Sequence, residues 1–594
     1  MRLNFHAVPT FPRLAWCVRL EKGSRAADVF HGPWVETRED RFFEGAWDGD
    51  FGDGNFDRAE NFIGTGARVT DEGLLFAAPT ELLSGVFSLR AGDEAWFSNS
   101  FANLLVQTGD SPDPGYTDYA HDFIHSRAWG IRPYHRTFPT ANGNRVSIHL
   151  YSNLLVRSDL SRKRLEKNQP PQPETFEAYR ALLSGAIAGM IENGASPGRK
   201  IRYTPVTAIS RGYDSTCTAV LVREAGGRKA IAIRSPFERR PHHGDDGSEI
   251  AVQLGFDVIG RRLEELRELP PGSEAEFCAA LPSGSGIPKR MFETDLEGSI
   301  FITGFSGDII WSVDPKDRLP KMMIPAEKIA SEPQSYTEFR LRAGFLHFAP
   351  AYIGSIHRVR LHEIARSAEM SPWWLPVAYN RPIPRRIGEE AGIPREAFGQ
   401  VKQAGGALVL RADLLLPESR RDFLAFCDAN GLPTGTPKRR IRPIDLITLP
   451  IALFQTIVRR FRLEWIYRRL APLFLLADRR LLRRPAEFGY GYHWGFERVK
   501  GRYEWANGRI KFIRPFAHSL TPPPSPGIIP FPPDPLGGRR ASCMPGGKSA
   551  LRRARRRVTP GVAAGGVTPR LRREQGHRNR SPSASAGGQS EKVV

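Results

Sequence analysis

The chain of 594 residues is poor in cysteine and has no long apolar segment. Its five cysteines are scattered, odd in number and without a C-x-x-C pair, which argues against a disulfide framework or a zinc site and favours a reducing cytoplasm. The longest apolar run, "LITLPIALFQTIV" (446–458), is too short to cross a bilayer and contains Pro450. The amino terminus also lacks the continuous apolar core of a secretory signal. We therefore expect a soluble, cytoplasmic protein without a membrane span.

The positive charge is concentrated in the carboxy-terminal tail. The net charge is +21, and the stretch from Gly537 onward has 14 Lys and Arg residues against 2 Glu, which leaves +9 for the first 536 residues. Residues 517–594 consist largely of Pro, Gly, Ser, Ala and Arg, a composition that buries too little apolar surface to fold. We expect a disordered basic tail there; a nucleic-acid-binding arm and a non-native tail are the alternatives.

The first part of the chain has the pattern of an antiparallel β-domain. At this length three to four domains are expected. Residues 1–165 alternate short apolar runs with Gly and Asp turns, for example at 85–105 and 137–159, which is typical of strands in antiparallel sheets. The polar, proline-bearing segment "EKNQPPQPE" (166–174) predicts a linker. We therefore predict an α+β amino-terminal domain over residues 1–165.

The pattern changes after the linker. Strand-like segments such as "TPVTAI", "KAIAIR" and "SIFITG" alternate with helix-like segments such as "STCTAVLVREAG". This alternation predicts a parallel sheet with helices on both faces, and with the mainly helical stretch 336–430 it defines an expected α/β domain over 175–430. Over 440–516 we expect a carboxy-terminal subdomain of basic amphipathic helices (444–484) and a short aromatic hairpin (490–515).

The stretch "SRGYDS" (210–215) joins a predicted strand to a predicted helix. Unpaired backbone N–H groups at a helix amino terminus, together with the helix dipole, attract an anion such as phosphate. Ser210 and Ser215 add hydroxyl donors, and Asp214 fits such a site if Mg²⁺ lies between its carboxylate and the phosphate. A plain helix cap formed by Asp214 and Ser215 is the alternative.

This loop and three further segments resemble one family. Residues 210–215 resemble the S-G-G-x-D-S pyrophosphatase loop of the asparagine synthetase family, and "FITGFSGDIIW" (301–311) resembles its second motif, a strand followed by G-E-G-G/S-D-E. Upstream, "GDEAWFSNSFANLL" (92–105) resembles the segment of the family's amidotransferase domain that ends in F-A-S-E-x-K-A-L-L. The stretch 379–402 resembles the carboxy-terminal region of related proteins. The resemblance covers about residues 1–425 in the family's order.

The resemblance implies a fold and a reaction. The amino-terminal domain would be a degenerate class II (Ntn-type) glutamine amidotransferase domain, and the synthetase domain would resemble the adenine nucleotide α-hydrolases. A carboxylate would attack the α-phosphate of ATP, giving an acyl-adenylate and pyrophosphate, and ammonia or an amine would then displace AMP. The implied cofactors are ATP and Mg²⁺, with Asp214 and Asp308 as metal ligands.

The resemblance also implies site residues. The catalytic set is Asp214, Asp308 and Lys402, where Lys402 matches a family lysine that acts on pyrophosphate or on the acyl-transfer transition state; a solvated helix lysine is the alternative. Adenine would lie against the backbone at 208–209 and 233–235. The implied nucleotide-binding residues are Ile209, Ser210, Arg211, Gly212, Tyr213, Asp214, Ser215, Ser235, Gly304 and Gly307.

Three positions depart from the family pattern. Arg2 stands where the family's glutaminases expose a cysteine whose own α-amine serves as base, and Cys17, without a free amine, is expected in the core. Phe305 replaces a glutamate linked to handling the incoming amine and cannot carry a proton. Arg211 replaces a loop glycine, which costs backbone freedom but adds a charged, planar donor beside the anion. We therefore expect no glutaminase activity but retained ATP binding.

The leading expectation is an ATP-dependent, AMP-forming amide ligase of the asparagine-synthetase type. Its substrates would be a small-molecule or peptide carboxylate and an amine, free ammonia or ammonia from a partner protein. Asparagine itself is not the expected product, because of Arg2 and Phe305. The alternative is a catalytically degenerate nucleotide-binding or scaffold protein; nucleic-acid association ranks last. A metal site in "PHHGDDGSE" (241–249) is less favoured than a polar loop before an acid-rich helix start.

Overall fold

The computed structural model describes residues 1–120, 123, 137–235, 244–280, 286–311, 313, 336–375, 377, 379–400, 415–433 and 489–504, with isolated positions between 450 and 470. All of them belong to one unit, Met1–His518. No helix in these ranges is long and apolar enough to cross a membrane. The predicted tail at 517–594, and nearly all of the predicted helices at 444–484, lie outside the described residues.

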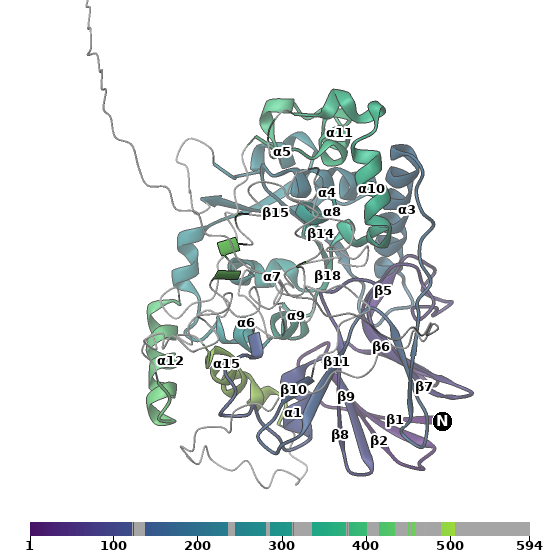
Figure 1. The fold of residues 1–594 in the computed structure, drawn as a ribbon, viewed down its shortest axis with the longest axis vertical. Coiled ribbons are helices and arrows are strands. Elements are labelled where there is room, and N and C mark those ends of the chain that lie inside the picture. Colours follow the sequence, from purple (N-terminus) through teal and green to yellow (C-terminus); the bar gives the residue numbers. More distant parts are fainter. Residues whose placement is uncertain are drawn as a thin grey trace, which may run out of the picture. The chain divides into compact units, whose positions relative to one another are not determined.

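Two β-sheets form the amino-terminal region (Figure 1). The first has the order β1 (Arg2–Ala7), β3 (Ala26–His31), β2 (Trp16–Glu21), β9 (Glu94–Ser98), β8 (Val86–Ala91), β11 (Arg145–His149) and β10 (Thr137–Pro139). The second has the order β13 (Arg162–Leu165), β12 (Asn153–Val156), β7 (Gly73–Ala77), β6 (Phe62–Thr70), β5 (Arg41–Trp47) and β4 (Glu36–Arg38). All their described pairings are antiparallel except β1 with β3, so the predicted antiparallel system is confirmed.

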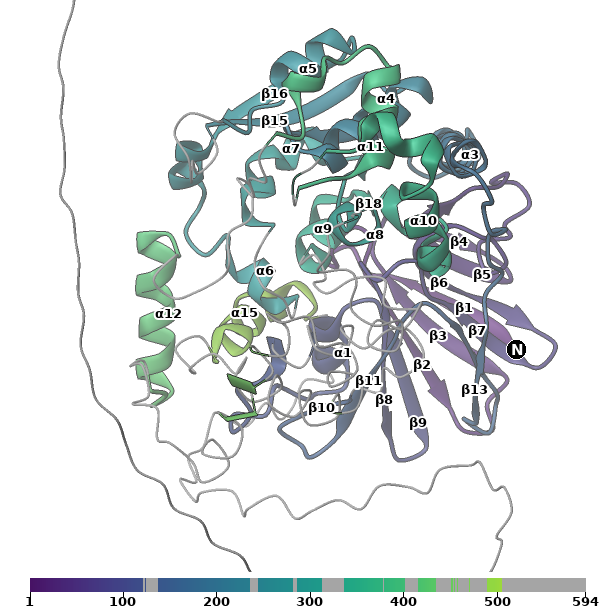
Figure 2. The same ribbon diagram turned by 45° about the horizontal axis from the view of Figure 1, so that its top comes forward.

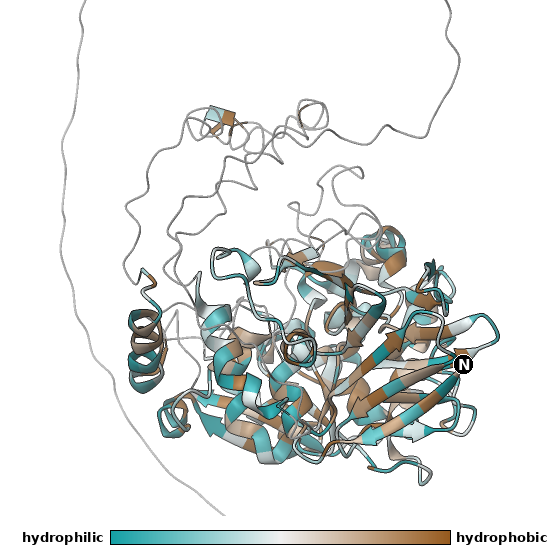
Figure 3. Cartoon of the chain, turned by 90° about the horizontal axis from the view of Figure 1, so that it is seen from below, coloured by the Kyte–Doolittle hydropathy of each residue, from teal (hydrophilic) through white to brown (hydrophobic). Residues whose placement is uncertain are grey.

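The two sheets share an aromatic core. Trp16 of β2 packs against Phe42 of β5 and Phe76 of β7, with ring centroids 5.2 and 6.2 Å apart. Side chains alternate between the faces of a strand, so each sheet contributes every second residue to this core. Hydrophobic positions along these strands are visible in Figure 3.

One segment of this region forms a helix instead of a strand. The sequence pattern predicts strands throughout 85–105, but Phe101–Gln107 forms helix α1. The helix begins there because the Ser100 hydroxyl accepts the backbone N–H of Asn103 at 2.9 Å and caps the first turn. Phe101 to Val106 are all buried, so the structure has no alternation of buried and exposed positions there, and the apolar residues serve a buried helix instead of a strand.

A five-stranded parallel sheet forms the second region. Its order is β16 (Asp257–Arg262), β15 (Lys229–Ser235), β14 (Thr204–Ile209), β17 (Ser299–Ile302) and β18 (Leu346–Phe348). All four pairings are parallel, which confirms the predicted α+β then α/β layout. The α-helices of the described chain after α1 are α3 (Phe176–Ala195), α4 (Tyr213–Glu224), α5 (Ser248–Gln253), α6 (Ala275–Ala279), α7 (Glu293–Leu296), α8 (Gly307–Ile310), α9 (Thr337–Ala343), α10 (Arg358–Ala365), α11 (Pro382–Glu390), α12 (Pro417–Ala429) and α15 (Gly491–Val499).

Strand β17 of the parallel sheet is buried on both faces. Ile300 and Ile302 of β17 pack into one hydrophobic cluster, whereas Phe301 between them packs into a second. Figures 1 and 2 show α4 and α11 close together beside the sheet, and α6 and α15 close together elsewhere. Burial on both faces explains the continuous apolar run at 300–302 in β17, whereas the edge strand β16 is only partly buried and less apolar.

The aromatic segment 490–504 is helical, so the predicted hairpin is wrong over these residues. Helix α15 buries residues on every side, among them Tyr492, Trp494 and Phe496. A Cβ on Gly495 would lie 2.5 Å from the backbone nitrogen of Ala279, so α15 lies directly on α6. The aromatic residues at every second position from 490 to 496 are therefore buried on different sides of one helix, and do not lie on one face of a strand.

A buried ion pair joins the two regions. Arg340 of α9 donates to Glu44 of β5 through both terminal nitrogens, at 2.5 and 3.0 Å. Glu44 Oε1 also accepts the hydroxyl of Thr65 at 2.8 Å and the side-chain amide of Asn99 at 3.3 Å. Both oxygens of this buried carboxylate are therefore fully engaged.

Candidate functional site

The loops 210–215 and 303–308 lie side by side at the carboxyl ends of the parallel strands β14 and β17. The chain runs from β14 outward to β15 and β16, then returns to β17 on the opposite side of β14. The loops that follow β14 and β17 therefore flank the point where the strand order reverses. In open α/β sheets, ligands bind outside the carboxyl ends of the strands at such a point.

The first loop is folded by its own hydroxyl groups. Ser215 Oγ accepts the backbone N–H of Ser210 at 3.2 Å and lies 2.9 Å from Ser210 Oγ, which in turn accepts the N–H of Gly212 at 3.1 Å. Gly212 is the cap of α4, which begins at Tyr213. The loop thus presents the amino terminus of a three-turn helix at the edge of the sheet.

Both glycines of the second loop are required for contact with the first. A Cβ on Gly304 would lie 2.4 Å from the backbone carbonyl carbon of Asp214, and one on Gly307 would lie 2.7 Å from the Asp214 carboxylate. Ser306 between them has a left-handed backbone, with φ of +64°, and its hydroxyl donates to Tyr352 Oη at 3.2 Å. Only residues without a side chain allow this approach of the two loops.

Asp214 is ion-paired with an arginine that the sequence analysis did not single out. Arg381, at the start of α11, donates to Asp214 Oδ2, and its side chain is 5% exposed. Burial alone would lower the pKa of the Arg381 guanidinium, but the charge of Asp214 raises it above its ordinary value. The Asp308 carboxylate adds a smaller effect in the same direction. Asp214 therefore has a buried positive partner, Arg381.

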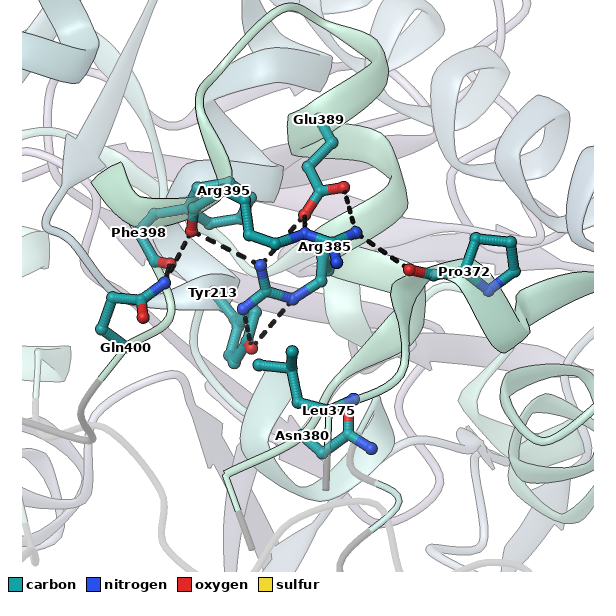
Figure 4. A network of polar contacts seen from close by, with 9 residues as sticks. All are labelled: Tyr213, Pro372, Leu375, Asn380, Arg385, Glu389, Arg395, Phe398 and Gln400. Carbon is teal, nitrogen blue, oxygen red and sulfur yellow. Dashed lines mark hydrogen bonds and ion pairs between the residues drawn. The ribbon is translucent and has the colours of Figure 1, made fainter. Parts of the chain in front are cut away.

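Tyr213 is turned toward α11 (Figure 4). Its hydroxyl accepts from the buried Arg385, which also donates to Glu389 at 3.0 Å, and burial raises the pKa of Tyr213. Glu389 in turn binds Arg395 at 2.7 Å. This network fixes the amino terminus of α4 against α11, so the Tyr213 side chain has a positioning role in the loop.

Arg211 lies away from Asp214. Its guanidinium binds Glu249 at 2.7 Å and the carbonyl oxygen of Asp246 at 3.2 Å, and the pair with Glu249 is exposed. The expected donation from Arg211 to a bound anion therefore requires this pair to open. Asp246 Oδ1 accepts the N–H of Ser248 at 2.9 Å, which confirms the expected acid-rich helix start at α5.

The two strands whose ends are expected to contact adenine, β14 and β15, are neighbours in the sheet. Ile209 at the end of β14 is paired with Ala232 of β15, and Ser235 ends β15 at the same edge of the sheet. The Ile209 side chain is buried. Adenine contact at this edge stays a prediction.

Lys402 lies outside the described residues, but the chain leading to it passes the first loop. The N–H of Gly399 donates to the carbonyl oxygen of Arg211 at 2.8 Å. A Cβ on Gly399 would lie 2.3 Å from the Tyr213 ring. The segment after α11 is therefore anchored on the first loop within three positions of Lys402.

The amino-terminal region has no exposed thiol at its start. Arg2 opens β1, and its backbone N–H donates to the carbonyl oxygen of Arg25 at 2.7 Å. Cys17 is fully buried in β2, as predicted, and burial raises the pKa of its thiol. Phe305 of the second loop packs against the hydrophobic core.

The residues fit a divalent cation only in part. Mg²⁺ commonly uses one or two carboxylates together with substrate phosphates. Asp308 is exposed and fits this role, and Asp214 Oδ1 is buried without a hydrogen-bond partner among the described residues. The other Asp214 oxygen, however, is held by Arg381. No group of three or more potential metal ligands occurs within the described part of the chain.

No protein-family model matches this sequence, and no curated protein matches it. The family resemblance of the motifs therefore stays a prediction.

Proposed function

We propose that the chain is an asparagine-synthetase-like, AMP-forming amide ligase without its own glutaminase activity. The observation that carries the proposal is the contact between the loops 210–215 and 303–308 at the strand-order reversal. Two loops with aspartates that meet beside a helix amino terminus suit a polyphosphate ligand. The proposal includes an Ntn-like fold for the amino-terminal sheets and an adenine nucleotide α-hydrolase-like fold for the parallel sheet.

The chain's own residues would divide the work of binding ATP. The amino terminus of α4 would face the pyrophosphate part of the nucleotide, and Ser210 and Ser215 would hold the loop in shape. Asp214 and Asp308 would hold Mg²⁺, which when bound neutralises part of the polyphosphate charge. The carboxyl ends of β14 and β15 would face adenine. Lys402 would act on the pyrophosphate.

The nitrogen would come from outside the amino-terminal region. A class II glutaminase needs an accessible thiol, whereas Cys17 of β2 is fully buried in the core. Phe305 supplies no acid or base beside Asp308. The proposed acceptor is therefore free ammonia, ammonia from a partner protein, or an amine that needs no proton transfer at position 305.

ATP–pyrophosphate exchange with a panel of carboxylates, aspartate included, tests the proposal. We expect exchange with at least one acid in the wild type, and loss of exchange in Asp214→Asn. Asp257→Asn is the matched control, because Asp257 is exposed at the amino end of β16 in the same sheet, opposite the proposed site. No exchange with any acid and no ATP affinity would refute the ligase proposal.

A nucleotide-binding protein without catalysis is the second candidate. It is favoured by the ion pair between Arg381 and Asp214, which occupies a carboxylate that the reaction needs, and by Phe305. ATP binding without exchange for any acid would favour this candidate over the ligase.

A further inference from the structure

Arg381 lies where the two loops meet and holds a carboxylate that the proposed function assigns to a cation. Its side chain is 5% exposed and that of Asp214 is 14% exposed. The ion pair is incomplete, because Asp214 Oδ1 and Arg381 Nε are both buried without a hydrogen-bond partner among the described residues. Buried polar atoms are normally paired, so these two residues, which contact each other where the loops meet, keep a donor and an acceptor that a ligand could use.

The surroundings of Arg381 hold its guanidinium beside Asp214. The Tyr379 ring lies 4.9 Å from the guanidinium carbon, and the guanidinium feels the charges of both Asp214 and Asp308. One buried cation therefore balances the Asp214 carboxylate and also lies in the field of Asp308. That is the electrostatic role that a divalent ion has in a two-aspartate site.

We propose that Arg381 competes with a divalent cation for Asp214, so that the cation binds this site appreciably only together with an anionic phosphate ligand. The inference rests on the proposed function, since it concerns the same two carboxylates. In the structure Arg381 occupies Oδ2, and Gly307 lies beside Oδ1 without a side chain, since a Cβ there would lie 2.7 Å from that oxygen.

Arg381 has the donors that such an exchange requires. Its Nε has no acceptor among the described residues, and a guanidinium binds phosphate oxygens through two parallel N–H groups. When a phosphate oxygen draws Arg381 from Asp214, the freed carboxylate becomes available to the cation. Phosphate and cation would then bind with positive coupling, each raising the affinity of the other.

The test measures binding of Mn²⁺ alone to the full chain by electron paramagnetic resonance, without nucleotide. We expect wild type and Asp214→Asn to bind Mn²⁺ with the same low affinity, because Asp214 is not available in either. We expect Arg381→Met to bind Mn²⁺ about tenfold more tightly or better, since a competing positive charge in contact with the carboxylate is gone. Arg360→Met is the control, since this arginine of α10 pairs instead with Glu174 and Glu363 and should leave Mn²⁺ affinity unchanged.

The double variant Asp214→Asn/Arg381→Met locates the gained affinity. It should lose the gain of Arg381→Met, because the carboxylate is absent. A lower Mn²⁺ affinity of Asp214→Asn than of wild type would overturn the proposal even if Arg381→Met does not fold. A gain that persists in the double variant would overturn it as well. Absence of ATP–pyrophosphate exchange would refute the ligase activity but leave these Mn²⁺ affinities as predicted.

Discussion

Two buried arginine–carboxylate pairs in this protein differ in how completely their carboxylates are bonded. Glu44 receives four hydrogen bonds, from Arg340, Thr65 and Asn99, and both of its oxygens are used. Asp214 receives only Arg381, and its second oxygen has no hydrogen-bond partner among the described residues. The first pair joins the amino-terminal sheets to α9, and the second lies where two loops meet at the edge of the parallel sheet.

The difference separates structure from function. A carboxylate that is buried with both oxygens bonded, as in Glu44, is held rigidly and fixes one packing arrangement, although Arg340 Nε is itself buried without a partner among the described residues. A buried carboxylate with an unbonded oxygen, as in Asp214, costs stability that a ligand at that oxygen would restore. We therefore assign the Glu44–Arg340 pair to the joining of the two regions and the Asp214–Arg381 pair to ligand binding.

The largest expected effect is on the Glu44–Arg340 pair. Arg340→Met leaves Glu44 buried and unbalanced, and should lower the free energy of unfolding by about 3–5 kcal/mol. Asp214→Asn, which breaks the other pair, should cost less, about 1–3 kcal/mol. Urea unfolding measures both. As a control, Arg180→Met removes a more exposed arginine of α3 and should cost at most about 1 kcal/mol. Equal losses for Arg340→Met and Asp214→Asn would break the comparison.

The next effect concerns the contact between the two loops. Gly304→Ala places a methyl group 2.4 Å from the Asp214 backbone, so the loops must separate, at about 1–3 kcal/mol of stability. Gly185→Ala on α3 is the control, because a Cβ there meets no neighbouring atom and the backbone is ordinarily helical. Gly272→Ala would not serve, because the positive φ of Gly272 adds strain. Gly185→Ala should be neutral or stabilising. Crystallography of Gly304→Ala should show Asp214 displaced; an unmoved Asp214 would contradict the account.

A smaller effect is expected from His347 of β18, which lies near the Glu44–Arg340 pair. Burial, and then the charge of Arg340, lowers the pKa of His347 to about 3. The unfolded chain binds this proton below about pH 6.5, whereas the folded chain does not, so stability is full above that pH and falls on acidification. His347→Gln should make this fall shallower by up to about 1.4 kcal/mol per pH unit. Urea unfolding from pH 7 down to pH 5 measures the slope; an unchanged slope would refute the burial of a neutral histidine.

The smallest effect is expected at Arg211. Its pair with Glu249 is exposed, so Arg211→Ala should change stability by less than about 1 kcal/mol. Nucleotide affinity should also change little, since the guanidinium is directed at Glu249 in the structure. A large loss of ATP affinity in Arg211→Ala would show that Arg211 leaves Glu249 for the nucleotide, as the sequence analysis expects.

The sequence predicted the strand–loop–helix units well because their signals are local. Apolar runs such as "TPVTAI" and "SIFITG" end in glycine- and serine-bearing loops, and parallel strands bring such loops to one edge. The three-residue strand β18 was missed because so short a run has no measurable period. The sequence of α15 predicts a hairpin because the helix is buried on every side, so its apolar residues do not recur with the 3.6-residue period of a half-buried helix.

Arg381 was beyond the reach of local patterns. It is 167 positions from Asp214 along the chain, and "YNRPIPRR" resembles any arginine-rich helix start. Arg381 joins the site only because the tertiary fold packs the start of α11 against the loop 210–215. The same holds for Arg385, whose contact with Tyr213 turns that ring away from the edge of the sheet.

Calorimetric titration of ATP with Mg²⁺ into wild type, Asp214→Asn and Asp257→Asn tests the central claim most directly. The account predicts binding to wild type and to Asp257→Asn with equal affinity, and a loss of at least about tenfold in Asp214→Asn, because a carboxylate at the meeting point of the two loops is removed. Equal ATP affinity in all three proteins, or no binding to the wild type, would contradict a nucleotide site at this edge of the sheet.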